Sequence, residues 1–139
     1  MSTYPKSPKE MTGGMMWFPR LIDKIRLHAR GELSEDYHAN LGEGFDKRCL
    51  GFLRVDYANL CERTLAGGTD EEVLDWCFEK GRPLDKGDLF IWKSFVSKFG
   101  WNDVATNRLN ELKEKFGFGD RKDIVTIAEL LDLDEGRHT

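Results

Sequence analysis

The chain has 139 residues, a formal net charge of −4 and three cysteines. A chain of this length suits one domain and can bury a core without metals or disulfides. Residues 1–33 carry six Lys and Arg against three Asp and Glu, a balance of +3, which leaves 15 against 22, a balance of −7, for residues 34–139. A basic end on an acidic body argues against nucleic-acid binding, for which a basic domain is typical.

The cysteines and the hydropathy pattern indicate the cellular compartment of the protein. Cys49, Cys61 and Cys77 are an odd number and form no CxxC pair. The sequence also shows no secretory signal and no apolar run long enough to cross a bilayer. We therefore predict a cytoplasmic protein without membrane association, in which the cysteines are small buried apolar groups.

The first element is predicted to be an arm. Pro5, Pro8 and the Gly13–Gly14 pair favour extended or turning backbone. We expect an N-terminal arm over residues 1–14 and a single helical domain over residues 15–139.

The stretch from Gly13 to Gly31 holds the best-defined helix start. Proline suits the first turn of a helix, so Pro19 predicts a start there, and Gly31 ends the pattern. Apolar residues recur at spacings of three and four, which places them on one stripe: Leu21, Ile22, Ile25 and Ala29.

Two polar rows flank this stripe. Arg20, Lys24 and His28 follow each other at intervals of four, and Asp23, Arg26 and Arg30 occupy the other flank. Arginines can clamp a carboxylate or phosphate, and histidine titrates near neutral pH. The row pattern makes these the candidate ligand-binding residues: Arg20, Asp23, Lys24, Arg26 and His28. The alternative is a solvated charged face with ordinary Asp–Arg pairs.

Further helices follow a predicted loop over residues 32–44, in which His38 is a second titratable group. Thr69 with Glu72 is typical of a capping box, and Thr126 with Glu129 repeats the pattern. The predicted segments are 45–55, interrupted at Gly51; 57–65; 69–81; 85–100; a helix that Trp101 and Val104 lead into and Gly117 ends; and 123–136. The segment 85–100 is predicted to be the core helix, from its apolar set Leu89, Trp92, Phe95, Val96 and Phe99. No run predicts a strand. We predict an all-α fold, a compact single domain of six or seven short helices with an extended N-terminal arm.

The acidic stretch at the end of the last helix is unusual. Asp132, Asp134 and Glu135 lie at a helix C-terminus, where carboxylates oppose the helix dipole. This mismatch suggests a basic partner nearby, such as the first helix, and the alternative is a solvated acidic end.

Motifs with a strong chemical meaning are absent. The sequence has no glycine-rich phosphate loop, no HExxH pair and no GxSxG elbow, and it lacks paired metal-ligand spacing. It therefore predicts no metal site, and it assigns neither catalytic residues nor a cofactor.

The order of several segments resembles one known family. These segments are Ser7–Pro8, Gly13–Gly14, FPRLIDKIRLHARGEL at 18–33, TDEEVLDWCFEKGRP at 69–83, Trp92 and DIVTIAELLDLDEGR at 123–137. Together they are similar to the bacterial family described as domain of unknown function 5069. The resemblance supplies no activity, substrate or cofactor. It gives weight to two charged motifs: Pro19, Arg20, Asp23, Lys24 and Arg26 near the start, and Asp134, Glu135, Gly136 and Arg137 near the end.

Three hypotheses follow. The first is a binding or accessory module whose first helix presents Arg20, Lys24 and Arg26 to an anionic small molecule or an acidic protein surface. The second is a small enzyme with an acid/base site built from Asp23, Lys24 and His28. The third is a structural or interaction domain, in which the same charges pair with Asp132, Asp134 and Glu135.

Overall fold

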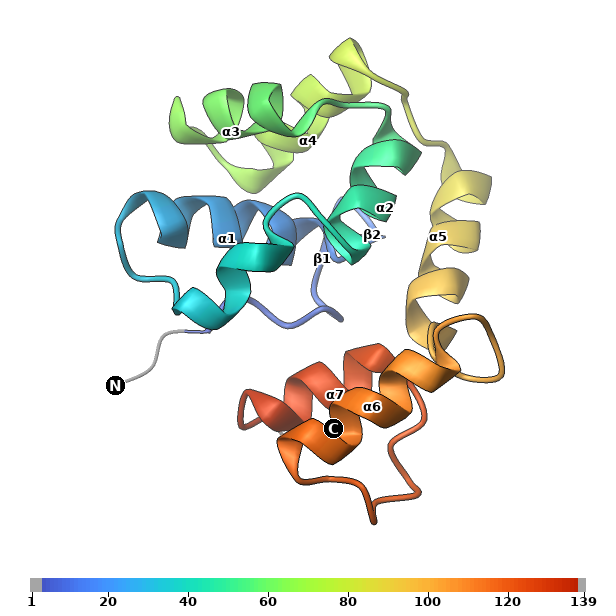
Figure 1. The fold of residues 1–139 in the computed structure, drawn as a ribbon. Coiled ribbons are helices and arrows are strands. Elements are labelled where there is room, and N and C mark those ends of the chain that lie inside the picture. Colours follow the sequence, from blue (N-terminus) through green and yellow to red (C-terminus); the bar gives the residue numbers. More distant parts are fainter. Residues whose placement is uncertain (1–3, 138–139) are drawn as a thin grey trace.

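The computed structural model describes residues 4–137 and confirms the all-α class (Figure 1). These residues hold seven α-helices, one short 3-10 helix and a two-stranded ladder. Their bounds are β1 Met11–Thr12, β2 Met15–Met16, α1 Phe18–Ala29, η1 Glu35–Asn40, α2 Phe45–Leu53, α3 Tyr57–Leu65, α4 Asp70–Lys80, α5 Lys86–Lys98, α6 Thr106–Phe116 and α7 Ile127–Asp134.

The ladder corrects the expectation that the chain has no strand. Met11 pairs with Met16 and Thr12 with Met15 in antiparallel register. Gly13 and Gly14 form the connecting turn with φ values of 56° and 83°. Glycine adopts positive φ without a Cβ clash, so this pair suits a two-residue hairpin turn. The strands have two residues each, too few for an alternating pattern to reveal them.

Helix α1 is the centre of the larger apolar core. Phe18, Leu21 and Ile22 are fully buried, and the helix packs against α3 and β1. Pro19 lies in its first turn, as predicted. This core also takes buried side chains from α2, α3, α4 and α5, including Cys49, Leu53, Leu60, Val73 and Trp92.

Two local expectations are wrong. Residues 35–40 of the predicted loop form η1, where the Ser34 hydroxyl accepts a hydrogen bond from the Asp36 amide. Helix α2 passes through Gly51 without a break and ends at Leu53; the next residue, Arg54, is left-handed with φ 58°. Flanking residues of α2 are buried, and this packing outweighs the modest cost of one helical glycine.

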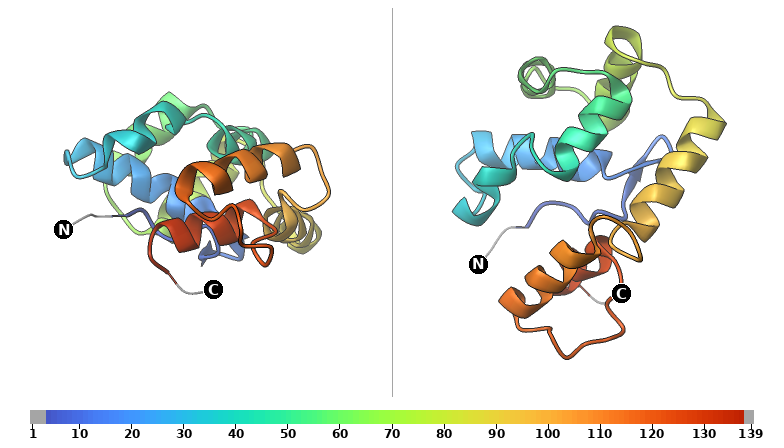
Figure 2. Two further views of the ribbon diagram at one scale, coloured as in Figure 1. Left: turned by 60° about the horizontal axis from the view of Figure 1, so that its bottom comes forward. Right: turned by 45° about the vertical axis from the view of Figure 1, so that its right-hand side comes forward.

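Helix α5 is less central than its apolar pattern predicts. Trp92 and Val96 are buried, but Phe95 is 38% exposed. The Trp92 indole donates to the Met16 carbonyl over 2.7 Å, which fixes α5 to β2. Helix α5 runs along one side of the molecule and leads to the α6–α7 hairpin, as the right-hand view of Figure 2 shows.

The α6–α7 hairpin has an apolar cluster of its own, built on Leu109, Ile124 and Leu130. The Ile127 amide donates to the Phe99 carbonyl over 2.9 Å, which ties the start of α7 to the end of α5. The far end of α7 reaches α1 and the N-terminal arm through charged groups. That junction brings the two charged motifs together.

Candidate functional site

The five candidate residues on α1 differ widely in exposure. Arg20 is 2% exposed and Lys24 is 4% exposed. Asp23 and Arg26 are half-buried, and His28 is exposed. Arg20 and Lys24 lie one turn apart, so the same face of α1 directs both inward. Buried charges are stable only when they are paired, so their partners decide what this face does.

Arg20 forms a bidentate ion pair with Glu135. Its Nη1 and Nη2 atoms donate to Oε1 and Oε2 over 2.9 and 2.7 Å. The two side chains are 2% and 0% exposed. Arg20 Nη1 also donates to the Lys6 carbonyl over 3.0 Å, which adds the N-terminal arm to the contact. Bidentate arginine–carboxylate geometry is among the strongest polar contacts in proteins.

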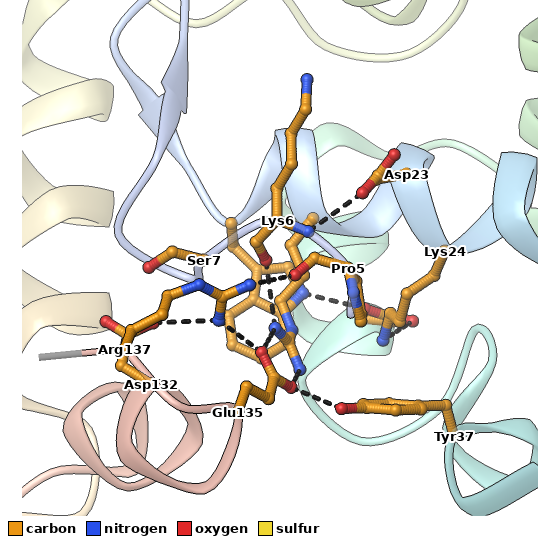
Figure 3. A network of polar contacts seen from close by, with 12 residues as sticks. Pro5, Lys6, Ser7, Asp23, Lys24, Tyr37, Asp132, Glu135 and Arg137 are labelled. Atoms are coloured by element: carbon orange, nitrogen blue, oxygen red, sulfur yellow. Dashed lines mark hydrogen bonds and ion pairs between the residues drawn. The ribbon is translucent and has the colours of Figure 1, made fainter. Parts of the chain in front are cut away.

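Two further side chains surround Glu135. The Tyr37 hydroxyl donates to Oε2 over 2.7 Å, and Arg137 donates to Oε1 and to the Pro5 carbonyl. Figure 3 shows the Glu135 carboxylate between Tyr37 on one side and Arg137 on the other. We call this set the Arg20–Glu135 network: Arg20, Tyr37, Glu135, Arg137 and the carbonyls of Pro5 and Lys6.

Electrostatics favour the ionised form of Glu135. Burial alone would raise the pKa of this carboxyl, but the Arg20 guanidinium and the Tyr37 and Arg137 hydrogen bonds hold it below its ordinary value. The neighbouring Asp134 behaves oppositely, because burial and the Glu135 charge raise its pKa. The network therefore surrounds the negative charge of Glu135 with hydrogen-bond donors from Arg20, Tyr37 and Arg137.

Lys24 pairs with a different carboxylate. Its Nζ lies 2.7 Å from Asp46 Oδ2, and their side chains are 5% and 0% exposed. Asp46 also accepts from the Trp17 indole over 2.8 Å and from the Gly42 amide over 3.2 Å. Burial lowers the pKa of Lys24, and the Asp46 charge opposes this shift. This second polar group joins α1 to the start of α2.

Arg26 and Asp23 contact the arm and α4. Arg26 Nη1 donates to Asp70 Oδ1 over 2.6 Å, and Lys6 Nζ lies 3.3 Å from Asp70 Oδ2. Asp23 accepts a hydrogen bond from the Lys6 amide over 3.0 Å. Burial would raise the pKa of Asp70, but Arg26 and Lys6 hold it below its ordinary value.

The two predicted histidines lie next to each other on the surface. The His28 and His38 ring centroids are 4.8 Å apart in an edge-to-face arrangement. His38 Nε2 is 3.1 Å from the Leu33 carbonyl oxygen.

The predicted residues thus pair with three different carboxylates of the chain, and Lys6 contacts both the Arg20 and the Arg26 groups. Arg20 contacts Glu135, Lys24 contacts Asp46, and Arg26 contacts Asp70. Asp132 pairs with Lys9 at 3.9 Å and with Arg137 at 3.2 Å, rather than with α1.

Two open cavities lie elsewhere, along α2. One of about 890 Å³ is lined by residues of α2 and the turn into α3, among them Lys47, Arg48 and Arg54. The other, of about 420 Å³, lies between α2 and α5, and Arg48 and Arg54 line it as well. Neither cavity is lined by a residue of α1.

Comparison with models of known families identifies the family of this chain. The family model described as Domain of unknown function (DUF5069) matches residues 2–137. The chain belongs to this family. The match includes both ends of the Arg20–Glu135 network, so the contact between α1 and α7 lies within the family's domain. A search of curated proteins found no match.

In this DUF5069 domain, sequence reasoning missed several residues that the site needs. Asp46 and Lys6 contact charged groups of α1, and Tyr37 donates to Glu135, the partner of Arg20. Asp46 lies in the first turn of a helix. Acidic residues are common there because they suit the helix dipole, so this position did not indicate a buried partner for Lys24. No rule of local spacing connects two contact partners that lie between 17 and 115 positions apart in the sequence.

Two kinds of feature are absent from the part of the chain that the structure describes. Among residues 4–137, no three His, Cys, Asp or Glu side chains gather in a way that would hold a metal ion. None of the helices in that part of the chain combines the length and apolar character that a bilayer crossing requires.

Proposed function

We propose that this protein is a binding or accessory domain without a catalytic centre, in which α1 is the structural support. The observation that carries the proposal is the bidentate Arg20–Glu135 pair, buried at 2% and 0% side-chain exposure. An arginine that is already matched by a carboxylate of its own chain has its charge and two of its donors occupied. An external anion would have to displace Glu135 and leave that carboxylate buried without its main partner.

The enzyme alternative has one feature in its favour. The lowered pKa of Lys24 is what a general base near neutral pH requires. However, Lys24 and Asp46 are enclosed, and Lys24 lines neither of the two cavities. Burial accounts for the lowered pKa of this amine, so the shift by itself does not indicate a catalytic role.

Thermal unfolding against a panel of phosphate, nucleotides, dicarboxylates and divalent metals tests the proposal. A ligand at a hundredfold excess over its Kd stabilises the folded state by about 2.7 kcal/mol, which raises the Tm of such a domain by several degrees. We expect no compound in the panel to give a rise that depends on α1.

Two variants make the test specific. Arg26→Gln removes a half-exposed cation of α1, and Arg108→Gln removes a cation from an exposed pair on α6. A stabilising anion whose effect is lost in Arg26→Gln or in Lys24→Met but kept in Arg108→Gln would overturn the proposal and restore the ligand site on α1.

A further inference from the structure

The surface shared by the two cavities combines unpaired cations with exposed apolar side chains. Lys47, Arg48 and Arg54 are exposed, and none forms an ion pair with any carboxylate of residues 4–137. Arg82 adds a fourth cation at the edge, 2.8 Å from Asp88. We call these four residues the basic surface. The positive charge of the basic surface contrasts with the formal net charge of the whole chain, which is −4.

An aromatic wall borders this surface on the α5 side. Phe52 and Trp92 stack at 5.0 Å between ring centroids, and Trp92 lies 5.9 Å from Phe95. Trp92 is only 3% exposed, so Phe52 and Phe95 supply the accessible part of the wall. The Arg82 guanidinium lies 4.8 Å from the Phe52 ring centroid. These rings are fixed by one another and by the bond from Trp92 to Met16. Ile91, 60% exposed, extends the apolar edge.

The floor between the two arginines is open backbone. Gly51 lines both cavities together with Arg48 and Arg54. A Cβ placed at Gly51 would meet no atom within 4 Å. The turn beyond it is fixed, because the Arg82 amide donates to the Leu53 carbonyl over 2.8 Å. The surface is therefore formed before any partner arrives.

We infer that the basic surface binds an acidic segment of a partner protein, with carboxylates on Arg48 and Arg54 and an apolar side chain against the aromatic wall. This inference rests on the proposed function and names the partner of the binding domain. Arginine is enriched at interface centres because it pairs bidentately with carboxylates, and aromatic residues serve as apolar anchors.

Charge complementarity selects this occupant over the others. An isologous dimer through this face would bring the same cations against each other. Nucleic acid would meet an acidic protein around one small basic area, and its binding would need a larger basic footprint. A partner that carries both carboxylates and apolar side chains matches the cations and the exposed apolar side chains of the surface, and Asp56 is the one carboxylate that lines the larger cavity.

The test uses the full chain and a synthetic amphipathic peptide of about 14 residues, with glutamates and leucines on opposite faces. Titration followed by amide NMR is expected to shift signals of α2 and α5 and to leave those of α6 unchanged. Affinity is expected to fall as salt rises. A counterpart peptide with glutamine for glutamate is expected to bind at least about tenfold more weakly.

Three variants locate the site. The double variant R48E/R54E is expected to weaken peptide binding by about tenfold or more. The matched double variant K115E/K122E reverses two exposed cations near α6 and should change affinity by less than about twofold. Gly51→Leu fills the floor without changing charge, and leucine favours a helix more than glycine does, so this variant is expected to stay folded and to lose peptide binding.

Several outcomes would overturn the inference. These are no binding of the acidic peptide, an equal loss in K115E/K122E, equal binding of the glutamine peptide, preferential binding to phosphatidylserine vesicles, or a concentration-dependent dimer that R48E/R54E abolishes. If the peptide does not bind and no anion of the thermal unfolding panel binds through α1, the inference fails but the proposed function stands. An anion bound through α1 instead refutes the proposed function, whatever the peptide does.

Discussion

Arg20 and Glu135 are 115 positions apart in the sequence and form a buried bidentate ion pair, with N–O distances of 2.9 and 2.7 Å. The pair joins α1 in the larger apolar core to the end of α7 in the smaller one. The N-terminal arm takes part through the carbonyls of Pro5 and Lys6. The contact therefore helps to fix how the α6–α7 hairpin lies against the rest of the domain, together with the hydrogen bond from Ile127 to Phe99.

Arg20→Ala is expected to lower the free energy of unfolding by about 3–5 kcal/mol, because it leaves Glu135 buried without its main partner. Urea unfolding followed by circular dichroism measures the effect. Arg108→Ala, which breaks an exposed pair with Glu111 at 65% and 66% exposure, is the control and should cost less than about 0.5 kcal/mol. The double variant R20M/E135L should recover much of the loss. Equal effects of Arg20→Ala and Arg108→Ala would contradict a structural role for the pair.

Replacement of Asp46 is expected to lower the free energy of unfolding more than replacement of its partner Lys24. Asp46→Ala leaves the ammonium of Lys24, the indole of Trp17 and the amide of Gly42 without an acceptor. It should cost about 3–5 kcal/mol, whereas Lys24→Met, which keeps two of the three contacts to Asp46, should cost about 1–3 kcal/mol. Urea unfolding gives both values, and the indole NH signal of Trp17 reports the lost bond. The prediction fails if Lys24→Met is the more damaging change.

Stability is expected to fall in acid partly through Glu135. Its pKa in the folded protein lies below the ordinary 4.5, so below that value the unfolded chain binds a proton that the folded protein does not. The free energy of unfolding then decreases as the pH falls through the ordinary value of 4.5 toward the lower pKa of the folded protein. Glu135→Gln removes this contribution and should flatten the curve of Tm against pH in that window.

Asp134 provides a control of opposite sign for the pH experiment. Its pKa is raised in the folded protein, so its protonation favours the folded state as the pH falls. Asp134→Asn should therefore steepen the acid loss of stability. Parallel curves for wild type, Glu135→Gln and Asp134→Asn would show that neither carboxyl controls the acid transition.

Any side chain at Gly81 is expected to destabilise the protein. A Cβ there would lie 2.1 Å from the Leu53 carbonyl oxygen and 2.8 Å from that of Arg54. Both obstacles are backbone atoms, so Gly81→Ala should cost about 1–3 kcal/mol. Gly51→Ala, at an open helical position, should instead add about 0.5–1 kcal/mol. Thermal unfolding of the two variants side by side checks the contrast, and a stable Gly81→Ala would contradict it.

Local rules predicted much of the fold. The Thr69–Glu72 capping box, the start near Pro19 and the helix end at Gly117 are present in the structure. These features depend on residues within one or two turns of each other. The apolar period identified α5 but overestimated its burial, because period alone does not say whether a second element covers each side.

The charged face of α1 shows the limit of the same reasoning. Spacing identified Arg20, Lys24 and Arg26 as neighbours on a helix, and the acidic end of α7 suggested a basic partner. Spacing could not show that Arg20 and Lys24 are buried, since that depends on the arm, on η1 and on α7 arriving at the same place.

The sequence by itself determined most of the helices, several of their caps and the two charged motifs, because hydrogen bonds and side-chain contacts within a few residues produce them. The tertiary structure alone decided that Arg20 contacts Glu135, that Lys24 contacts Asp46, and that Arg48 and Arg54 remain open beside an aromatic wall. The physical reason is that the energy of a charge depends on its burial and its partners, and those partners come from distant parts of the chain.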